Sequence, residues 1–341
     1  MAGIREVAEL AGVSLGTVSN VLNHPEMVAE ETRQRVQAVI EQLGFVRNGS
    51  ARQLRAGHSR HLGLVVLDVT NPFFTEVARG VEDAANKAGY VVILCNSDDS
   101  PEKEGRYLHV LLEQRTAGVL ITPVQNDTGY LQRLRQQGIA IVLLDRPSRA
   151  RGLCSVAVDD VLGGELATRH LLELGHRSIA FVSGPLTIRQ CADRRRGMCR
   201  AIKSLGLEPE QIIVDIPAAA QHASAGEQCV DNLLHHPRKP TAAFCANDLL
   251  ALGIMRGLSE RGVKIPAEMA LVGYDDVEFA GVLSPALTSV RQPKYQLGRS
   301  AAELLLDEVM NADHHQHKQV VYRPELIVRA TTLPPGGSNR R

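Results

Sequence analysis

The pattern of hydrophobic and polar positions divides the chain into three segments. In residues 1–46 apolar residues recur three and four positions apart, which predicts three short helices. The first has one apolar face made of Ile4, Val7, Ala8 and Ala11. After Gly12, Ser14 is suited to cap a second helix that turns Val18, Val21 and Leu22 inward. A third helix is expected from Glu30 to Leu43, with Gly44 as its stop.

Residues 47–61 show no sustained apolar pattern and are interpreted as a hinge between domains. This stretch holds four arginines (Arg47, Arg52, Arg55, Arg60), two histidines (His58, His61) and no acidic residue. Such a basic segment is a candidate for binding phosphates, and a solvated linker is the alternative.

From Leu62 onward, short apolar runs alternate with amphipathic helical stretches. The runs are 62–67, 90–95, 118–122, 139–144, 155–158, 178–182, 211–214, 241–245 and 269–274. Continuous apolar strands separated by helices are typical of parallel sheets covered on both faces. About nine strands suit two α/β lobes better than one wide sheet. We therefore expect a two-lobe domain over 62–335, with a ligand cleft at the carboxyl ends of its strands.

Composition and charge restrict the class of protein without identifying it. The 341 residues are 44% hydrophobic and 22% charged, as in ordinary globular proteins. Lys and Arg number 38, as do Asp and Glu, so bulk charge does not indicate a nucleic-acid partner. No apolar stretch approaches the roughly 20 residues of a membrane span, and the acidic first residues do not resemble an export signal. The six cysteines form no CxxC pair, which favours a reducing, cytoplasmic location.

Residues 8–23 have the order helix, glycine-containing turn and second helix that is typical of a helix-turn-helix. An ordinary corner between two helices has the same spacing. If the segment binds DNA, Ser14, Thr17 and Ser19 can donate hydrogen bonds to phosphates, and Asn20 can contact adenine. Leu15 and Gly16 would reach bases only through apolar contact or close backbone approach.

The motifs taken together resemble the lactose/galactose-repressor (LacI/GalR) family of bacterial transcription regulators. The matching segments are IREVAELAGVSLGTVSNVLN (4–23), EETRQRVQAVIEQLGF (30–45), ARQLRAG (51–57), VTNPFF (69–74), VAVDD (156–160), LGHRSIAFVSGP (174–185), CANDLLALG (245–253), VGYDD (272–276) and RPELIVRAT (323–331). The resemblance implies a helix-turn-helix headpiece (1–46), a hinge (47–61) and a two-lobe parallel α/β sensor of periplasmic-binding-protein type. We assign lobe 1 to about 62–160 and 291–319, and lobe 2 to about 161–290 and 320–335.

The resemblance also implies a homodimer that binds a pseudo-palindromic operator in double-stranded DNA. In such a complex the hinge folds on DNA and inserts Leu54 into the minor groove, where an apolar wedge bends the duplex. The neighbouring positions expected at the DNA are Asn48, Ala51, Arg52 and Arg55. The chain departs from the family before the hinge, because Phe45-Val46-Arg47-Asn48 stands where Tyr-x-Pro-Asn is usual.

For the sensor, the resemblance implies a cleft lined by residues from both lobes. They are Asn71, Phe73, Phe74, Asp145, Arg146, Arg194, Gln221, Asn247 and Asp275. Carboxylates, amides, a guanidinium and aromatic rings suit a polyhydroxylated ligand such as a sugar. Each position also has a structural alternative. Asn247 and Asp275 can cap helices, Phe74 can be core, Asp145 and Arg146 can form a surface pair, and only one of Arg194–Arg196 is expected to face the cleft.

Nothing in the sequence indicates an enzyme, a cofactor or a metal site. The chain contains no GxGxxG after its first strand and no GxxxxGK[ST], GxSxG or HExxH. We interpret Gly163-Gly164 as a packing or capping feature, and His314, His315 and His317 as a solvated turn instead of a metal-binding group. The prediction is a cytoplasmic dimeric repressor that responds to a small molecule, expected to be a sugar or its derivative. A regulator controlled by a partner protein and a transporter's solute-binding protein are the alternatives.

Overall fold

The computed structural model describes residues 3–45, 59–125, 129–148 and 152–332. The chain divides into two compact units, Met1–Ser59 and Arg60–Arg341, which are described separately below. We call the first the headpiece and the second the sensor unit. No helix in these described ranges is long and apolar enough to cross a membrane.

The headpiece is built from short helices around a small apolar core. Its elements are α1 (Ile4–Ala11), α2 (Leu15–Asn23), the 3-10 turn η1 (Pro25–Met27) and α3 (Glu30–Leu43). Gly12 and Gly44 end α1 and α3 with positive φ angles of 63° and 57°, a conformation that glycine adopts without strain. The buried core consists of Val7, Ala8, Ala11, Val18, Val21, Val36 and Val39. The three predicted helices are therefore confirmed, although Ile4 of the predicted apolar face is 37% exposed.

Lobe 1 of the sensor unit is a parallel six-stranded sheet in the order β11-β5-β4-β3-β1-β2. Its strands are β1 (His61–Val66), β2 (Val91–Asn96), β3 (Gly118–Ile121), β4 (Ala140–Leu144), β5 (Cys154–Val158) and β11 (Gln319–Tyr322). Its helices are α5 (Pro72–Lys87), α6 (Pro101–Glu113), α7 (Gly129–Gln136) and α14 (Lys294–Met310). One core cluster joins α5 and α14 to the sheet, and a second joins α6 and α7 to the sheet.

Lobe 2 repeats this architecture in a second six-stranded sheet, in the order β12-β10-β9-β8-β6-β7. Its strands are β6 (Ile179–Ser183), β7 (Ile213–Pro217), β8 (Ala242–Cys245), β9 (Ala270–Asp275), β10 (Thr288–Arg291) and β12 (Glu325–Ile327). β12 runs antiparallel to β10. The helical elements are α8 (Asp160–Glu173), α9 (Arg189–Ser204), α10 (Pro209–Ile212), α11 (Ala223–Gln228), α12 (Val230–Leu234), α13 (Asp248–Glu260) and the 3-10 turn η2 (Glu278–Gly281).

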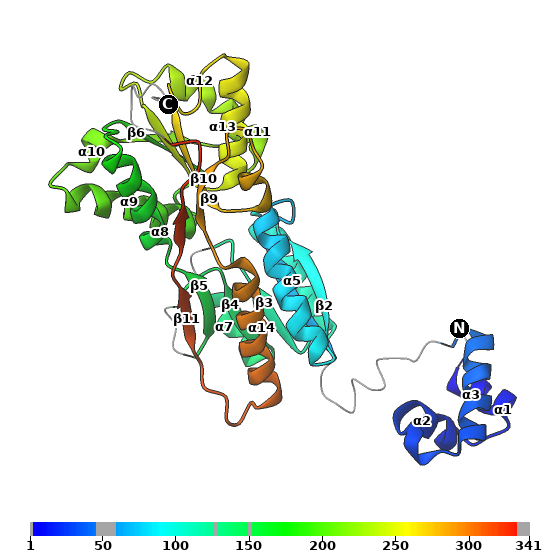
Figure 1. Ribbon diagram of the computed structural model, residues 1–341. Coiled ribbons are helices and arrows are strands. Elements are labelled where there is room, and N and C mark those ends of the chain that lie inside the picture. Colours follow the sequence, from blue (N-terminus) through cyan, green and yellow to red (C-terminus); the bar gives the residue numbers. More distant parts are fainter. Residues whose placement is uncertain (1–2, 46–58, 126–128, 149–151, 333–341) are drawn as a thin grey trace. The chain divides into compact units, whose positions relative to one another are not determined.

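The chain passes between the lobes three times, after β5, after β10 and after β11 (Figure 1). The α/β fold predicted from the alternating pattern is thus confirmed. The predicted end of lobe 1 at 319 is wrong, because residues 319–322 form β11 and pair with β5 in the lobe 1 sheet. Arg291 likewise pairs within the lobe 2 sheet, with Asp275 of β9.

Close packing against α8 fixes the position of α9, which contributes residues to the cavity between the lobes. A Cβ atom on Gly164 of α8 would lie 2.0 Å from the carbonyl oxygen of Arg194 in α9. A Cβ on Gly197 of α9 would lie 2.0 Å from the carbonyl oxygen of Val161 in α8. The two helices therefore touch backbone to backbone, and the interpretation of Gly164 as a packing residue is confirmed.

Candidate DNA interface and effector cavity

The start of α2 has the local structure expected of the second helix in a helix-turn-helix. Ser14 caps the helix, because its hydroxyl accepts a hydrogen bond of 3.0 Å from the Thr17 amide. Val18 and Val21 point into the headpiece core. This fixes the orientation of the helix, so that the opposite face is free of the core.

The predicted DNA contacts in the headpiece lie on that outer face. Ser14, Leu15, Gly16 and Asn20 are exposed, with Leu15 at 45%, while Thr17 and Ser19 are half-buried. An exposed leucine at a helix start is available for apolar contact with a thymine methyl group. The predicted hinge contacts Asn48, Ala51, Arg52, Leu54 and Arg55 lie outside the described residues.

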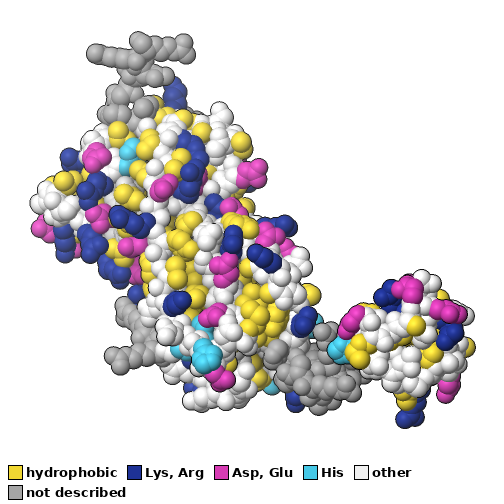
Figure 2. Space-filling model, turned by 60° about the horizontal axis from the view of Figure 1, so that its bottom comes forward, with side chains coloured by type: hydrophobic (Ala, Val, Ile, Leu, Met, Phe, Trp, Pro, Cys, Tyr) yellow, Lys and Arg dark blue, Asp and Glu magenta, His cyan; other side chains and the backbone are white. Residues whose placement is uncertain are grey.

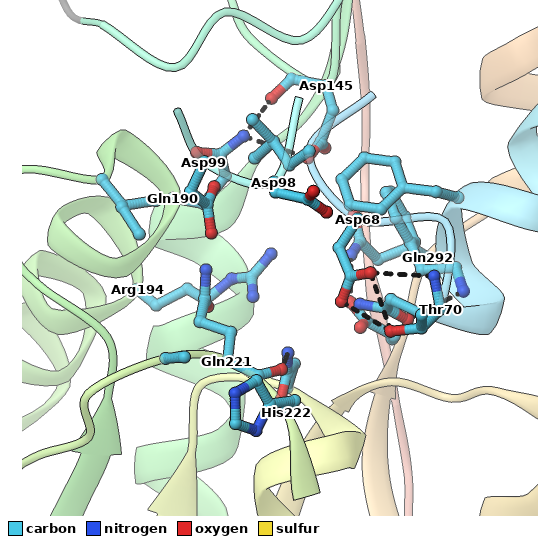
Figure 3. Close-up of a pocket in the computed structure, with 18 residues that line it drawn as sticks. Asp68, Thr70, Asp98, Asp99, Asp145, Gln190, Arg194, Gln221, His222 and Gln292 are labelled. Carbon is cyan, nitrogen blue, oxygen red and sulfur yellow. Dashed lines mark hydrogen bonds between the residues drawn. The ribbon is translucent and has the colours of Figure 1, made fainter. Parts of the chain in front are cut away.

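A cavity of about 320 Å³ lies between the two lobes at the carboxyl ends of their strands. Its walls are formed by residues that follow β1, β2 and β4 in lobe 1 and β6, β7, β8 and β10 in lobe 2, together with the last residue of β9. In Figure 3 Asp98 and Asp145 lie on one side of this space, with Arg194, Gln221 and His222 on the other. This is the position at which parallel α/β proteins bind their ligands.

The cavity brings together most of the residues predicted from the sequence. Those that line it are Asn71, Phe73, Phe74, Asp145, Arg194, Gln221, Asn247 and Asp275. Arg146 does not, and its prediction as a cavity residue is wrong. Its guanidinium donates to the carbonyl oxygen of Gln125. Successive residues after a strand point in different directions, so Asp145 reaches the cavity and its neighbour does not.

Arg194 is buried and held from three directions. Its Nε donates to Asp160 Oδ1 at 2.8 Å, and its Nη1 donates to the carbonyl oxygen of Ala246. The guanidinium carbon lies 3.6 Å from the centre of the Tyr274 ring. Burial acts to lower the pKa of Arg194, but the charge of Asp160 raises it above the ordinary value. The cavity therefore contains a permanent, rigidly placed cation.

Asp145 makes a hydrogen bond that crosses from lobe 1 to lobe 2. The Gln190 amide of α9 donates to Asp145 Oδ2 at 3.0 Å and to the Asp145 carbonyl oxygen at 2.9 Å. The other carboxylate oxygen, Oδ1, is buried without a hydrogen-bond partner. Burial, and then the charge of Asp160, raises the pKa of Asp145 well above its usual range. Among the described residues, one oxygen of this carboxyl group therefore has no hydrogen-bond donor.

Asp275 and Gln292 form a second polar pair at the cavity. The Gln292 amide donates to Asp275 Oδ1 at 2.7 Å, while Gln292 Oε1 is buried without a partner. Asp145 and Asp275 both adopt positive φ angles, 55° and 107°. Such backbone is strained for a residue other than glycine and concentrates at functional sites. Burial raises the pKa of Asp275 to about 6.

Two of the predicted residues also cap helices, a structural role that was expected for Asn247 but not for Asn71. The Asn71 side chain caps α5 by accepting from the Phe73 amide at 2.9 Å. Asn247 caps α13 by accepting from the Leu250 amide at 2.8 Å, and it donates to the Gln221 carbonyl oxygen. Both side chains are therefore fixed before any ligand arrives.

Several cavity residues were not predicted from the sequence. The polar ones are Asp68, Thr70, Asp98, Asp99, Gln190, His222 and Gln292. Asp98 and Asp99 follow β2 closely, so the same strand-end rule that selected Asp145 could have selected them. Gln190 and Gln292 gave no such signal, because only the folded arrangement of α9 and of the second interlobe crossing brings them to the cavity.

The chain combines a helix-turn-helix headpiece with a two-lobe unit that contains a polar cavity. This combination is typical of ligand-responsive transcription regulators, which are not enzymes. Residues 3–48 match the bacterial regulatory proteins of the lacI family. Residues 59–328 match the periplasmic binding proteins and sugar binding domain of the LacI family. The chain belongs to the LacI family of bacterial transcription regulators.

Individual relatives agree with this assignment over 80% or more of the chain. The HTH-type transcriptional repressor PurR of Vibrio atlanticus is 36% identical, over 97% of this chain and 98% of its own. The lac repressor dimer bound to operator and the anti-inducer ONPF is similar at TM-score 0.83 and 27% identity, covering 97% of this chain and 99% of that one. A ribose-bound LacI family regulator from Enterococcus faecium is 32% identical at TM-score 0.74, covering 80% and 99%.

Proposed function

We propose that this regulator is a dimeric repressor whose affinity for operator DNA changes when a neutral, single-ring sugar or close derivative binds between the lobes. The observation that carries the effector class is the pair of unsatisfied acceptors, Asp145 Oδ1 and Gln292 Oε1. Each buried acceptor without a partner costs about 1–3 kcal/mol. A ligand that donates hydrogen bonds to both removes this cost, and adjacent sugar hydroxyls offer such donors.

The charge of the cavity favours a neutral ligand over an anionic one. Among the described residues its lining includes five aspartates but a single arginine, Arg194, which is already paired with Asp160. The aspartates are Asp68, Asp98, Asp99, Asp145 and Asp275. Those of the aspartates that are ionised would repel a phosphate or carboxylate at low dielectric constant. Sugar phosphates and nucleotides are therefore disfavoured.

Size and shape support a small ligand. A volume of about 320 Å³ lies at the lower end of the roughly 300–1,000 Å³ usual for small-molecule sites. Phe73 and Phe74 provide an apolar wall, with ring centroids 5.0 Å apart and an angle of 80° between the rings. The ribose-bound relative from Enterococcus faecium is consistent with a single sugar ring. Similarity to PurR makes purines the competing class.

The edge of lobe 1 supports dimerisation. β2 is an edge strand whose Val91, Ile93 and Leu94 are 61%, 36% and 47% exposed. An exposed apolar edge strand invites pairing with another chain unless it is covered. A second copy would cover it symmetrically, and the lac repressor in the operator-bound structure is a dimer.

DNA recognition is proposed to combine the outer face of α2 with the hinge. Residues 14–20 would face the major groove, and Leu54 would act as a wedge in the minor groove. Leu54→Ala should weaken binding to the operator far more than binding to unrelated DNA at the same salt concentration. Fluorescence anisotropy with both DNAs measures this, and an equal loss on the two would contradict the wedge.

The effector is tested by thermal-shift and calorimetric titration of the full chain with neutral pentoses and hexoses, a sugar phosphate, and purine bases and nucleosides. Operator affinity is then measured with and without each binder, on DNA selected from a random pool by the protein itself. We expect a neutral sugar to bind and to change operator affinity. A response to purines alone would overturn the sugar assignment, and no response to any compound would favour control by a partner protein.

A matched pair of variants ties the response to the cavity. Asp145→Asn replaces the acceptor for the ligand by a donor, and should weaken sugar binding by about 10-fold or more, because a ligand hydroxyl would lose its acceptor. Asp215→Asn makes the same change at a half-exposed carboxyl group of β7, outside the cavity, and should leave binding unchanged. Equal affinities of the two variants would rule out contact between ligand and Asp145.

A further inference from the structure

Four potential metal ligands from three segments meet on lobe 1, away from the effector cavity. Cys154 begins β5, Glu308 lies near the end of α14, and His315 and His317 lie between α14 and β11. Their four candidate donor atoms all lie within 4.8 Å of one another. Histidine side chains are grouped on the surface of this unit in Figure 2. The spacing of the histidines at 314, 315 and 317 alone predicts a solvated turn, because the sequence does not show that Cys154 and Glu308 lie beside them.

The distances between these donors are close to those of a tetrahedral site. Cys154 Sγ lies 3.2 Å from His315 Nε2 and 3.6 Å from His317 Nδ1. His315 Nε2 lies 3.9 Å from Glu308 Oε2. Bonds of about 2.0–2.3 Å from zinc to nitrogen, oxygen and sulfur place neighbouring ligands roughly 3.3–3.8 Å apart. Only small movements would bring the donors into contact with one ion.

The surroundings prepare the donors for a cation. His315 Nδ1 is paired with Asp307 Oδ2 at 2.7 Å, which leaves Nε2 facing Cys154 and Glu308. A carboxylate behind a histidine is the usual support of a metal-bound imidazole. The Lys318 amide donates to Cys154 Sγ at 3.3 Å, a contact that would support a thiolate once a metal ion is bound. The side chains of Cys154 and His315 are almost completely buried.

An unsatisfied oxygen points to the missing partner. Glu308 Oε1 is paired with Arg135 Nη2 at 3.0 Å, but Glu308 Oε2 is buried and has no hydrogen-bond partner. Arg135 Nη2 also lies 3.3 Å from His317 Nε2. Binding of a metal at Nδ1 of His317 would place the ring proton on Nε2, so this second contact of Arg135 would be lost while its ion pair with Glu308 remains.

We propose that Cys154, Glu308, His315 and His317 form a structural site for a divalent transition metal, with zinc as the natural occupant. One thiolate, two imidazoles and one carboxylate are ligands that zinc accepts, and a closed four-ligand set is typical of structural sites. When the ion binds, the Cys154 thiol gives its proton to solvent and a sulfur–metal bond forms. None of these four residues lines the effector cavity, so the proposed metal site does not depend on the identity of the effector.

The site would fasten the last part of the chain to lobe 1. Cys154 belongs to β5, which pairs with β11. His315 and His317 immediately precede β11, after which the chain makes its third crossing between the lobes. Cys154 is at the amino end of β5, whereas the cavity lies at the carboxyl ends of the strands. The metal would therefore stabilise the edge of the sheet opposite the ligand, without touching the cavity.

The test uses the full chain without a histidine tag, dialysed against buffer with a weak chelator and analysed for metals by mass spectrometry. We expect about one zinc per chain. Replacement by Co²⁺ should give the intense visible bands of tetrahedral cobalt and a thiolate-to-cobalt charge-transfer band. His317→Gln, at an exposed residue, and Cys154→Ser should remove the zinc, and Asp307→Asn should weaken its binding about 10- to 100-fold.

His314→Gln is the matched control, because this exposed neighbour is not one of the four ligands. It should retain zinc, and strong chelator should lower its Tm as it lowers that of the native chain. The Tm of His317→Gln should not respond to chelator, and its circular dichroism shows whether it is folded. The proposal is wrong if the native chain contains less than a tenth of an equivalent of any transition metal and gives no tetrahedral cobalt spectrum. It is also wrong if folded His317→Gln retains metal with unchanged affinity.

Discussion

Replacing Arg194 by alanine should destabilise the sensor unit far more than the same change at its neighbour Arg195. Arg194 and Asp160 form a buried ion pair whose side chains are 5% and 7% exposed. Removing one partner of such a pair leaves an uncompensated charge and costs about 3–5 kcal/mol. The lost contact with the Tyr274 ring acts in the same direction. We expect Arg194→Ala to lower the free energy of unfolding by about 3–5 kcal/mol.

Arg195 provides the matched control one residue away on α9. It pairs with Asp215 with the same Nε–Oδ1 distance of 2.8 Å, but the two side chains are 32% and 49% exposed. An exposed pair contributes about 0.2–1 kcal/mol, and Arg195→Ala should cost no more than that. Burial, not the number of hydrogen bonds, decides the difference between the two positions.

Urea unfolding followed by far-ultraviolet circular dichroism measures both variants, since the chain contains no tryptophan. Adding Asp160→Asn to Arg194→Ala removes the unpaired charge and should recover part of the loss. Burial already raises the pKa of Asp160 against the opposing effect of Arg194, so loss of Arg194 raises it further. The Arg194→Ala defect should therefore grow as pH rises, because a raised carboxyl pKa favours folding only at low pH. Equal losses for Arg194→Ala and Arg195→Ala would refute this reasoning.

Three further predictions follow from packing, charge and the exposed edge strand. Gly164→Ala should lower the free energy of unfolding by about 1–3 kcal/mol through overpacking. Gly105→Ala should raise it by about 0.5–1 kcal/mol, because no described atom lies within 4 Å of the new Cβ. Urea unfolding that ranks the two variants the other way would contradict the close packing of α8 against α9. Burial raises the pKa of Asp275 from 3.8 to about 6, so its contribution to stability is present below about pH 4 and lost by about pH 6. The free energy of unfolding of Asp275→Asn, measured relative to the native chain, should therefore rise by on the order of 3 kcal/mol between pH 4 and pH 8. No relative change over this range would argue against the raised pKa. Leu94→Glu should shift the proposed dimer toward monomer in analytical ultracentrifugation. Leu205→Glu, which changes a 53% exposed residue after α9, should not. A dimer unaffected by Leu94→Glu would exclude the β2 edge as the dimer interface.

The sequence predicts the helices and strands β1 to β9 because each has a continuous or periodic apolar pattern. It does not predict β10, β11 and β12, whose sequences TSVR, QVVY and ELI are short and carry polar residues at their ends. Their pairing depends on the crossings between lobes, and these crossings decide which sheet each strand joins. The error at the end of lobe 1 has the same origin, since β11 is added to the lobe 1 sheet from a distant part of the chain.

The site is predictable where a residue directly follows or ends a buried strand, as Asp145 follows β4 and Asp275 ends β9. Such positions lie at the ligand edge of a parallel sheet whatever the details of the loops. Arg146 shows the limit of this rule, because the direction of a side chain one residue further on depends on the loop. Gln190 shows the other limit: the packing of α9 against α8 brings it to lobe 1, and no local pattern reports that packing.

The bond between Gln190 and Asp145 gives a physical measure of how a ligand could control the lobes. It joins lobe 2 to lobe 1, yet it satisfies only one oxygen of the Asp145 side chain and leaves the other buried and unpaired. That unpaired acceptor costs about 1–3 kcal/mol in the lobe arrangement of this structure. A single ligand hydroxyl that donates to this oxygen would remove this cost, which matches the roughly 1–3 kcal/mol of coupling found between sites in allosteric proteins. One hydrogen bond that is made in only one of two lobe arrangements would shift the equilibrium between them by about 5- to 150-fold. The remaining cavity contacts can then determine which ligand supplies it.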